Sequence, residues 1–540
     1  LNEDTRSVDL SANLNFDLAS IKEFYPIDED TLMMRGQLNA MVRLQGQPDP
    51  DRMEVLLQRS TVELQNGYIS HKTVARPLED ITLVAEATGT RLNISNARFR
   101  TGENSLAMTG SVSEYLSEDP NFDLTFDGNA LFDDISTYYS LEPWIQELTG
   151  NAVMNLNARG PAGDPTQIAL NGSLEVSNVN AIGDSIPLPI TDLSGSLNVT
   201  PDVMTLEQFS MNYGSSDLSL EGSLRRYLGF LDESHNSEAT MPNMTGDYQS
   251  RFLNMDEMID WEEETDEEPL PINLPNLTAD VTANIDSLVI FGLPITEISG
   301  SGRMNPNEMV LDEAEAKLFE GTASGTMIWK VPEPLRTNVR FQGSLNELRA
   351  KAFFRDTGFM GSNSRFHEYI SGLFSSEFDY YTELDETAAP DMTTTDASGT
   401  FGIAEGRIEG HPIQQRLAQF LRADELQRMN LDEFTATFAL KDTVMTLEDF
   451  RLTSDNIGME LEGTQHLVTD VINYKATLFL PERFKRGIAT VISSEAADAL
   501  QREDGTMAVP VLITGTSEDP QVRPDTTVIQ QVIQDRLREG

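Results

Sequence analysis

The chain is long, strongly acidic and free of cysteine: its 540 residues include 88 Asp and Glu against 38 Lys and Arg, a formal net charge of −50. This charge disfavours binding to nucleic acid and long-range attraction to an anionic membrane, because phosphates would be repelled. The lack of cysteine excludes disulfides and thiolate metal sites, and no stretch approaches the roughly 18 uncharged apolar residues of a membrane-spanning helix.

The acidic residues are scattered between apolar positions rather than gathered in one tail. This pattern predicts a solvated outer face, and it also suits a protein from a high-salt organism, where 1 M salt screens charges within about 3 Å. Position 1 is Leu1 rather than Met, so we expect a piece of a longer protein whose N-terminal anchor or address lies outside this chain.

Residues 1–130 are predicted to form a first β-repeat unit. Alternating apolar residues indicate strands at Leu10–Leu18 and Leu32–Leu44, around a short apolar stretch with helical spacing. Residues 131–250 are predicted to form a second unit that opens in the same way. Four residues recur 114 positions later: Ile21, Tyr25, Gly36 and Gly46 return as Ile135, Tyr139, Gly150 and Gly160.

Residues 251–275 interrupt this pattern and are predicted to be an acidic linker or loop, because they contain the run Glu262–Glu268. Residues 276–345 follow as a third β-repeat unit and consist almost wholly of predicted strands.

The C-terminal region, residues 346–540, starts with a segment that we predict to be irregular up to residue 395. A strand is predicted at residues 507–514, where apolar residues alternate. Helices are predicted at residues 410–430, 483–503 and 526–539. We interpret the last helix as a cap on the final sheet edge or as a contact for another protein.

The clearest repeated unit is LDEFTATFALKDTVMTLEDFRLTSDNIGMELEG, residues 431–463. Phe434 and Phe438 belong to an alternation of period two, which is typical of a strand with one apolar face. Polar turns near Asp442 and Asn456 separate two further short strands. Three such strands cannot bury an apolar face alone, so we expect neighbouring copies.

Three further copies lie upstream. Each copy opens with an apolar residue, a spacer, an acid and a second apolar residue, at residues 78–81, 190–193, 295–298 and 431–434. The middle strand of each has apolar residues two positions apart and another small or aromatic residue three positions later. A glycine follows 16, 16, 14 and 16 residues after the second apolar position: Gly110, Gly222, Gly325 and Gly463.

These repeats predict a mainly β protein, an elongated and curved antiparallel β-sheet that forms a β-groove, with a few short α-helices. The same alternation also describes a sandwich whose two sheets close on each other and leave no groove. Periodicity alone leaves both arrangements open.

The search for catalytic chemistry finds no constellation that resembles an active site. The five histidines are widely spaced, and neither a phosphate-binding glycine loop nor a Gly-x-Ser-x-Gly motif is present. His367-Glu368 is not followed by a second zinc-binding histidine, because Ser371 stands there. We therefore expect no enzyme activity, no catalytic residues, no cofactor and no metal site.

Several short motifs occur together in the second half of the chain: Gly292–Ile295, the Ala316–Gly321 turn, Gly399–Gly410 and Val509–Pro520. With these motifs, roughly residues 276–525 resemble the C-terminal region of the AsmA family of bacterial envelope proteins. The family is related to the TamB-like proteins and is similar to bridge-like lipid-transfer proteins.

The resemblance implies a periplasmic body anchored to the inner membrane by an N-terminal helix that this chain lacks. It implies a groove for phospholipid, or another acyl-chain lipid, moving between inner and outer membranes for outer-membrane lipid homeostasis. Two alternatives stay open. One is a scaffold that assists assembly of outer-membrane proteins, with such a partner at the C-terminal end; the other is a structural envelope or adhesin repeat protein.

The candidate groove residues are the apolar alternates of the four copies. They are Ile94, Leu206, Phe209, Leu311, Phe434, Phe438, Leu447 and Phe450. We expect each to face inward, towards lipid or towards other parts of the protein.

Overall fold

The computed structural model describes residues 7–24, 31–47, 56–74, 76–133, 145–184, 186–231, 241–258, 274–333, 336–357, 365–384 and 390–539. The chain divides into two compact units. Unit 1 is Leu1–Trp261 with Asn276–Thr282, and unit 2 is Glu262–Pro275 with Ala283–Gly540. The division falls inside strand β15 (Thr278–Ile290).

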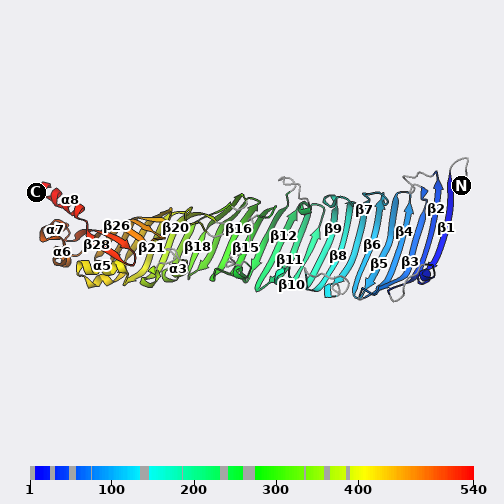
Figure 1. Ribbon diagram of the computed structural model, residues 1–540, viewed down its shortest axis with the longest axis horizontal. Coiled ribbons are helices and arrows are strands. Elements are labelled where there is room, and N and C mark those ends of the chain that lie inside the picture. Colours follow the sequence, from blue (N-terminus) through cyan, green and yellow to red (C-terminus); the bar gives the residue numbers. More distant parts are fainter. Residues whose placement is uncertain are drawn as a thin grey trace. The chain divides into compact units, whose positions relative to one another are not determined.

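Unit 1 is an antiparallel sheet in which each strand from β1 to β13 pairs with the next along the chain (Figure 1). The strands are β1 (Val8–Asp17), β2 (Leu32–Gly46), β3 (Ser60–His71), β4 (Leu78–Thr88), β5 (Arg91–Thr101), β6 (Asn104–Ser113), β7 (Asn121–Leu131), β8 (Glu147–Pro161), β9 (Ala169–Gly183), β10 (Ile186–Val199), β11 (Val203–Tyr213), β12 (Ser216–Arg225), β13 (Asn243–Ser250) and β14 (Leu253–Asn254). Its described helical segments are η1 (Leu18–Glu23), η3 (Pro165–Gln167), η4 (Tyr227–Leu231) and α2 (Met255–Met258).

Unit 2 contains a second antiparallel run, from β16 to β28, in which β21 pairs with both β22 and β23. The strands are β16 (Leu293–Asn305), β17 (Glu308–Leu318), β18 (Gly321–Glu333), β19 (Arg336–Arg349), β20 (Ile370–Leu384), β21 (Asp396–Glu409), β22 (Arg428–Leu431), β23 (Glu433–Lys441), β24 (Val444–Ser454), β25 (Ile457–His466), β26 (Val471–Leu480), β27 (Met507–Thr516) and β28 (Pro520–Pro524). The helices are α3 (Ala350–Thr357), α4 (Phe366–Tyr369), α5 (Pro412–Leu421), η5 (Asp424–Gln427), η6 (Glu482–Phe484), α6 (Lys485–Ile492), α7 (Ser494–Ala499) and α8 (Thr526–Glu539).

In three of the four copies the opening signature marks a β-bulge, whereas in the fourth the residues Glu433 to Thr435 pair without a register shift. Asp80, Asp192 and Glu297 have φ values of 53°, 55° and 50°, and the pairing register shifts at each of these residues. Such a bulge bends the strand and increases its twist. The predicted fold class, a curved antiparallel sheet built from repeats with a few short helices, is thereby confirmed within each unit.

A second bulge explains the three-residue step in the middle strand of each copy. In β24, Leu447 pairs with Gly463 and Phe450 pairs with Leu461, so two residues, Glu448 and Asp449, occupy a place that normally takes one. The same shift occurs in β5, β11 and β17. Because the bulge takes up the extra residue, the apolar residues before and after it point to the same face of the sheet.

The closing glycine of each copy lies against the backbone of the next strand. A Cβ atom at Gly110, Gly222, Gly325 or Gly463 would come closer than 3.0 Å to a backbone carbonyl oxygen of that strand. The shorter spacing of the third copy reflects a different register, because Gly325 pairs with Ala314 rather than with Leu311. In the other copies the glycine pairs with the second apolar residue.

Several predicted boundaries were wrong. The segment predicted to be irregular up to residue 395 contains the 15-residue strand β20. The helix predicted at 410–430 ends at Leu421, because Arg422 adopts a left-handed conformation. The helix predicted at 483–503 is two helices, separated at Ser493, which has a φ of 103°.

The helix predicted at 526–539 and the strand predicted at 507–514 are confirmed as α8 and β27. Some predictions fall outside the described residues: the acidic run Glu262–Glu268, and Tyr25, Ile135 and Tyr139 of the second repeat. The glycines of that repeat correspond, since Gly36 and Gly150 both lie at register shifts with positive φ.

We predict that Gly463→Ala lowers the free energy of unfolding by at least about 2 kcal/mol, because its φ of 142° and the backbone of β26 both oppose a Cβ atom. Gly458→Ala, in the same strand, is the control, since its Cβ would make only ordinary contacts with Phe479. Chemical denaturation measures both. Equal stability of the two variants would contradict the role assigned to the glycine.

Candidate functional site

One face of the unit 1 sheet is apolar from edge to edge. Directly paired residues on neighbouring strands point to the same face, so the registers define rows of side chains that cross the sheet. One such row takes a residue from each of thirteen strands, and all are apolar except for one glycine. The row is Phe16, Leu38, Leu64, Leu83, Ala97, Met108, Phe126, Leu156, Gly172, Val199, Met204, Leu224 and Met244.

Parallel rows on this face, which we name the apolar face, contain three of the predicted groove residues. Ile94, Leu206 and Phe209 each pair across the strands with alanine, leucine or glycine. Thirteen strands at about 4.8 Å spacing give the long row a length of about 58 Å. The structure therefore places these three predicted residues on one continuous apolar surface within unit 1.

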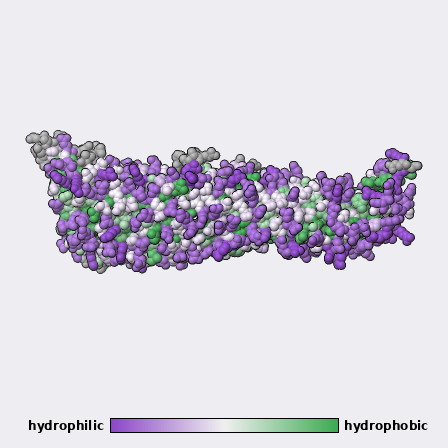
Figure 2. Space-filling model, turned by 180° about the vertical axis from the view of Figure 1, so that it is seen from behind, coloured by the Kyte–Doolittle hydropathy of each residue, from purple (hydrophilic) through white to green (hydrophobic). Residues whose placement is uncertain are grey.

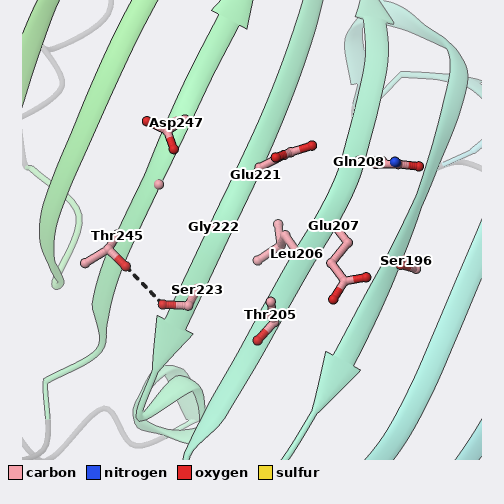
Figure 3. A pocket seen from close by; sticks show the side chains of 11 residues that line it. Ser196, Thr205, Leu206, Glu207, Gln208, Glu221, Gly222, Ser223, Thr245 and Asp247 are labelled. Carbon is pink, nitrogen blue, oxygen red and sulfur yellow. Dashed lines mark hydrogen bonds between the residues drawn. The ribbon is translucent and has the colours of Figure 1, made fainter.

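The opposite face of the same strands is polar. On it, Asn155 Nδ2 donates to Asp127 over 2.9 Å and Asn157 Nδ2 donates to Asp123 over 3.0 Å. Figure 3 shows this face at β11 to β13, where the hydroxyls of Ser223 and Thr245 lie 3.0 Å apart. The sheet thus presents one hydrated face and one hydrophobic face.

The apolar face of unit 1 is only partly shielded from water. Leu14 is 52% exposed and Leu10 is 49% exposed, and most other members of the rows are half-buried. Among the described residues of unit 1, the longest helical segment has six residues. Figure 2 shows hydrophobic residues, in green, at the molecular surface among hydrophilic ones. The described part of unit 1 therefore leaves this face open.

In unit 2, helices cover the apolar face of the later strands. Phe353 and Phe354 of α3 pack on Phe374 of β20, with ring centroids 4.5 and 5.1 Å away. Leu417 of α5 and Ile488 of α6 belong to the same buried cluster. This cluster is a closed protein core.

Four predicted groove residues lie in that closed core: Phe434, Phe438, Leu447 and Phe450. They face inward, and their neighbours include the covering helices as well as the sheet. Leu311 lies half-buried on β17, outside the buried cluster, between Gly302 and Met327. Three of the eight predicted residues thus lie on the apolar face of unit 1, four lie in the covered core of unit 2, and Leu311 belongs to neither group.

The N-terminus of α5 places a half-buried titratable group, His411, beside this core. His411 Nδ1 accepts a hydrogen bond from the Ile413 amide over 3.3 Å, and Gln414 Oε1 accepts one from the His411 amide. The imidazole ring lies edge-on to Tyr369 at 5.2 Å. Burial in these surroundings lowers the pKa of His411 to about 4, against a weaker opposing effect of Asp470.

A hollow on the polar face collects three carboxylates. Glu207, Glu221 and Asp247 line it beside Gly222 and Gly246 (Figure 3). Within the described ranges, no group of three or more His, Cys, Asp or Glu side chains is arranged to hold a metal ion. We therefore assign the hollow to the solvated face.

No model of a known protein family matches the chain, and no curated protein matches it either. None of the helices in the described part of the chain is both long and apolar enough to span a membrane.

The long row could not be recognised by aligning the copies with one another, because it is made of residues that pair across neighbouring strands. Counting an extra residue at each bulge would have aligned Ala97 with Met108 and Leu83. His411 was missed as well, although Pro412 directly after it is a recognisable signal of a helix start.

We predict that the stability of the wild-type protein falls between pH 7 and pH 5 by about 2 kcal/mol more than that of His411→Asn. The unfolded histidine titrates near 6.5 and the folded one near 4, so only the unfolded chain takes up a proton in this range. Above pH 7 the histidine is neutral in both the folded and the unfolded chain, so the two proteins no longer differ in how their stability depends on pH. Denaturant titrations at both pH values measure it, and identical losses in the two proteins would contradict the assignment.

Proposed function

We propose that the protein binds acyl chains of phospholipids along the apolar face of unit 1 and provides a path for them across the periplasm, between inner and outer membranes. The observation that carries this proposal is the thirteen-strand row, an apolar surface about 58 Å long. The resemblance of residues 276–525 to the AsmA family points to the same function.

The hydrophobic effect explains why such a surface would be useful. Each buried methylene contributes about 0.8 kcal/mol, so exposing a sixteen-carbon chain to water costs roughly 12 kcal/mol. A lipid that keeps its chains on the apolar face avoids most of this cost at every step. No chemical step is needed, and rows of similar side chains offer similar binding energy from strand to strand.

The polar parts of the protein fit this arrangement. A phospholipid headgroup would stay in water beside the sheet while its chains lie on Leu, Met and Phe side chains. The net charge of −50 opposes adsorption of the whole body to an anionic bilayer, so the sheet would remain in the aqueous space. The hydrated face, with its Asn, Ser, Thr and Asp side chains, keeps the open sheet soluble.

We predict that Leu174→Glu reduces the amount of co-purifying phospholipid several-fold. Leu174 lies between Met154 and Leu197 on the apolar face, and a carboxylate there would have to lose its hydration when an acyl chain binds. Lipid extraction followed by mass spectrometry measures the bound phospholipid per protein.

The matched control is Ser173→Glu, one residue away in β9, which lies between Asn155 and Asn198 on the polar face. It adds the same charge and should leave bound phospholipid unchanged. Circular dichroism verifies that both variants are folded. Wild-type protein that carries no lipid from a lipid-rich membrane extract, or equal losses in both variants, would overturn the proposal.

A further inference from the structure

A second apolar site lies inside unit 2, between the covered sheet and α3, α4 and α5. It is a cavity of about 170 Å³. Aromatic and aliphatic side chains make up most of its wall, among them Phe401, Phe434, Phe450, Leu461 and Leu478. It differs from the open face of unit 1, because helices as well as the sheet contribute to its wall.

Three polar side chains in the wall, those of Tyr474, Gln465 and Gln414, are engaged within the protein. Tyr474 Oη donates to Gln465 Oε1 over 3.1 Å, and Gln465 Nε2 donates to Asp470 over 3.0 Å. Gln414 Nε2 donates to the Ile408 carbonyl over 3.1 Å. A ligand that needs hydrogen bonds would gain little here, whereas an apolar ligand would fill space that water occupies poorly.

The cavity opens beside the turn between β27 and β28. Glu518, which is exposed, belongs to its lining, and the preceding Ser517 is held by its amide donating to Asp470 over 3.0 Å. Arg365 and Arg416 are ion-paired with Glu368 and Asp519, over 2.6 and 2.9 Å, and Arg365 also interacts electrostatically with Glu518. Two arginines thus face three carboxylates here, and the opening keeps a net negative charge.

We propose that this cavity binds an uncharged alkyl segment of about six carbons, the size that apolar cavities of about 150 Å³ accept. The wall supplies hydrophobic contact, and Glu518 excludes a ligand whose carboxylate would sit at the opening. This inference is independent of the proposed function, because the cavity lies in the closed core and not on the open face.

The experiment compares 1-hexanol with hexanoate on the wild-type protein at pH 7, by calorimetric or NMR titration. We expect saturable binding of 1-hexanol and at least about tenfold weaker binding of hexanoate. Glu518→Gln should reduce the difference in affinity between 1-hexanol and hexanoate, because it removes the carboxylate that repels hexanoate at the opening. The apolar wall is unchanged in this variant.

Leu447→Phe adds volume to the cavity wall and should abolish 1-hexanol binding. If Leu447→Phe does not fold, Met459→Phe can be used instead to fill the cavity, because Met459 is a less buried residue of the same wall. Val471→Phe is the matched control, since Val471 is 52% exposed and does not line the cavity. It should bind 1-hexanol like the wild type.

The proposal is overturned if wild-type protein shows no saturable binding of 1-hexanol, or if a folded wall variant binds it as well as the wild type. Equal binding of hexanoate and 1-hexanol would refute the role of Glu518. None of these outcomes bears on phospholipid binding to unit 1, which Leu174→Glu tests separately.

Discussion

Every bulged strand of this sheet has to keep its apolar side chains on one face. A strand alternates with period two, so a single extra residue would turn all later side chains to the opposite face. Here the bulge at Glu448-Asp449, and its equivalents in the other copies, takes up that residue in a local bend. The strand curves, and Leu447 and Phe450 nevertheless share one side of the sheet. The same solution recurs in β5, β11 and β17, so the bulged strands of each unit keep their apolar residues on one face.

The two units use this face differently. In the later strands of unit 2 helices cover it, and the resulting core contains the most deeply buried residues, such as Phe374 and Val509. In unit 1 the described residues leave it half-exposed, with a large apolar area that a soluble protein normally covers. The same alternation of apolar residues thus contributes to a closed core in one part of the chain and to an open hydrophobic surface in another. The open surface is where the proposed acyl-chain ligand would bind.

Much of the sheet could be predicted from the sequence, because its strands alternate and its repeats share spacing. The three strands around Phe438 were predicted nearly to the residue, and so was α8. The strand β20 was missed because the glycine- and serine-rich residues just before it suggested an irregular segment.

The division of the candidate residues into open and covered groups could not be predicted. Leu447 and Leu206 occupy corresponding positions in their copies, and only the packing of distant helices distinguishes them. Helix-on-sheet contacts such as Phe354 against Phe374 depend on the path of the chain between elements, which local periodicity does not encode. The cavity, for the same reason, is a property of the packed core alone.

The central claim is that the apolar face of unit 1 contacts acyl chains. The most direct measurement is photocross-linking in living cells with a photoreactive phenylalanine analogue placed at Met154, on the apolar face, or at Asn155, on the polar face. The account predicts that the analogue at Met154 becomes attached to phospholipid and that the analogue at Asn155 does not. Attachment at Met154 only to other protein, or equal attachment of lipid at both positions, would contradict it.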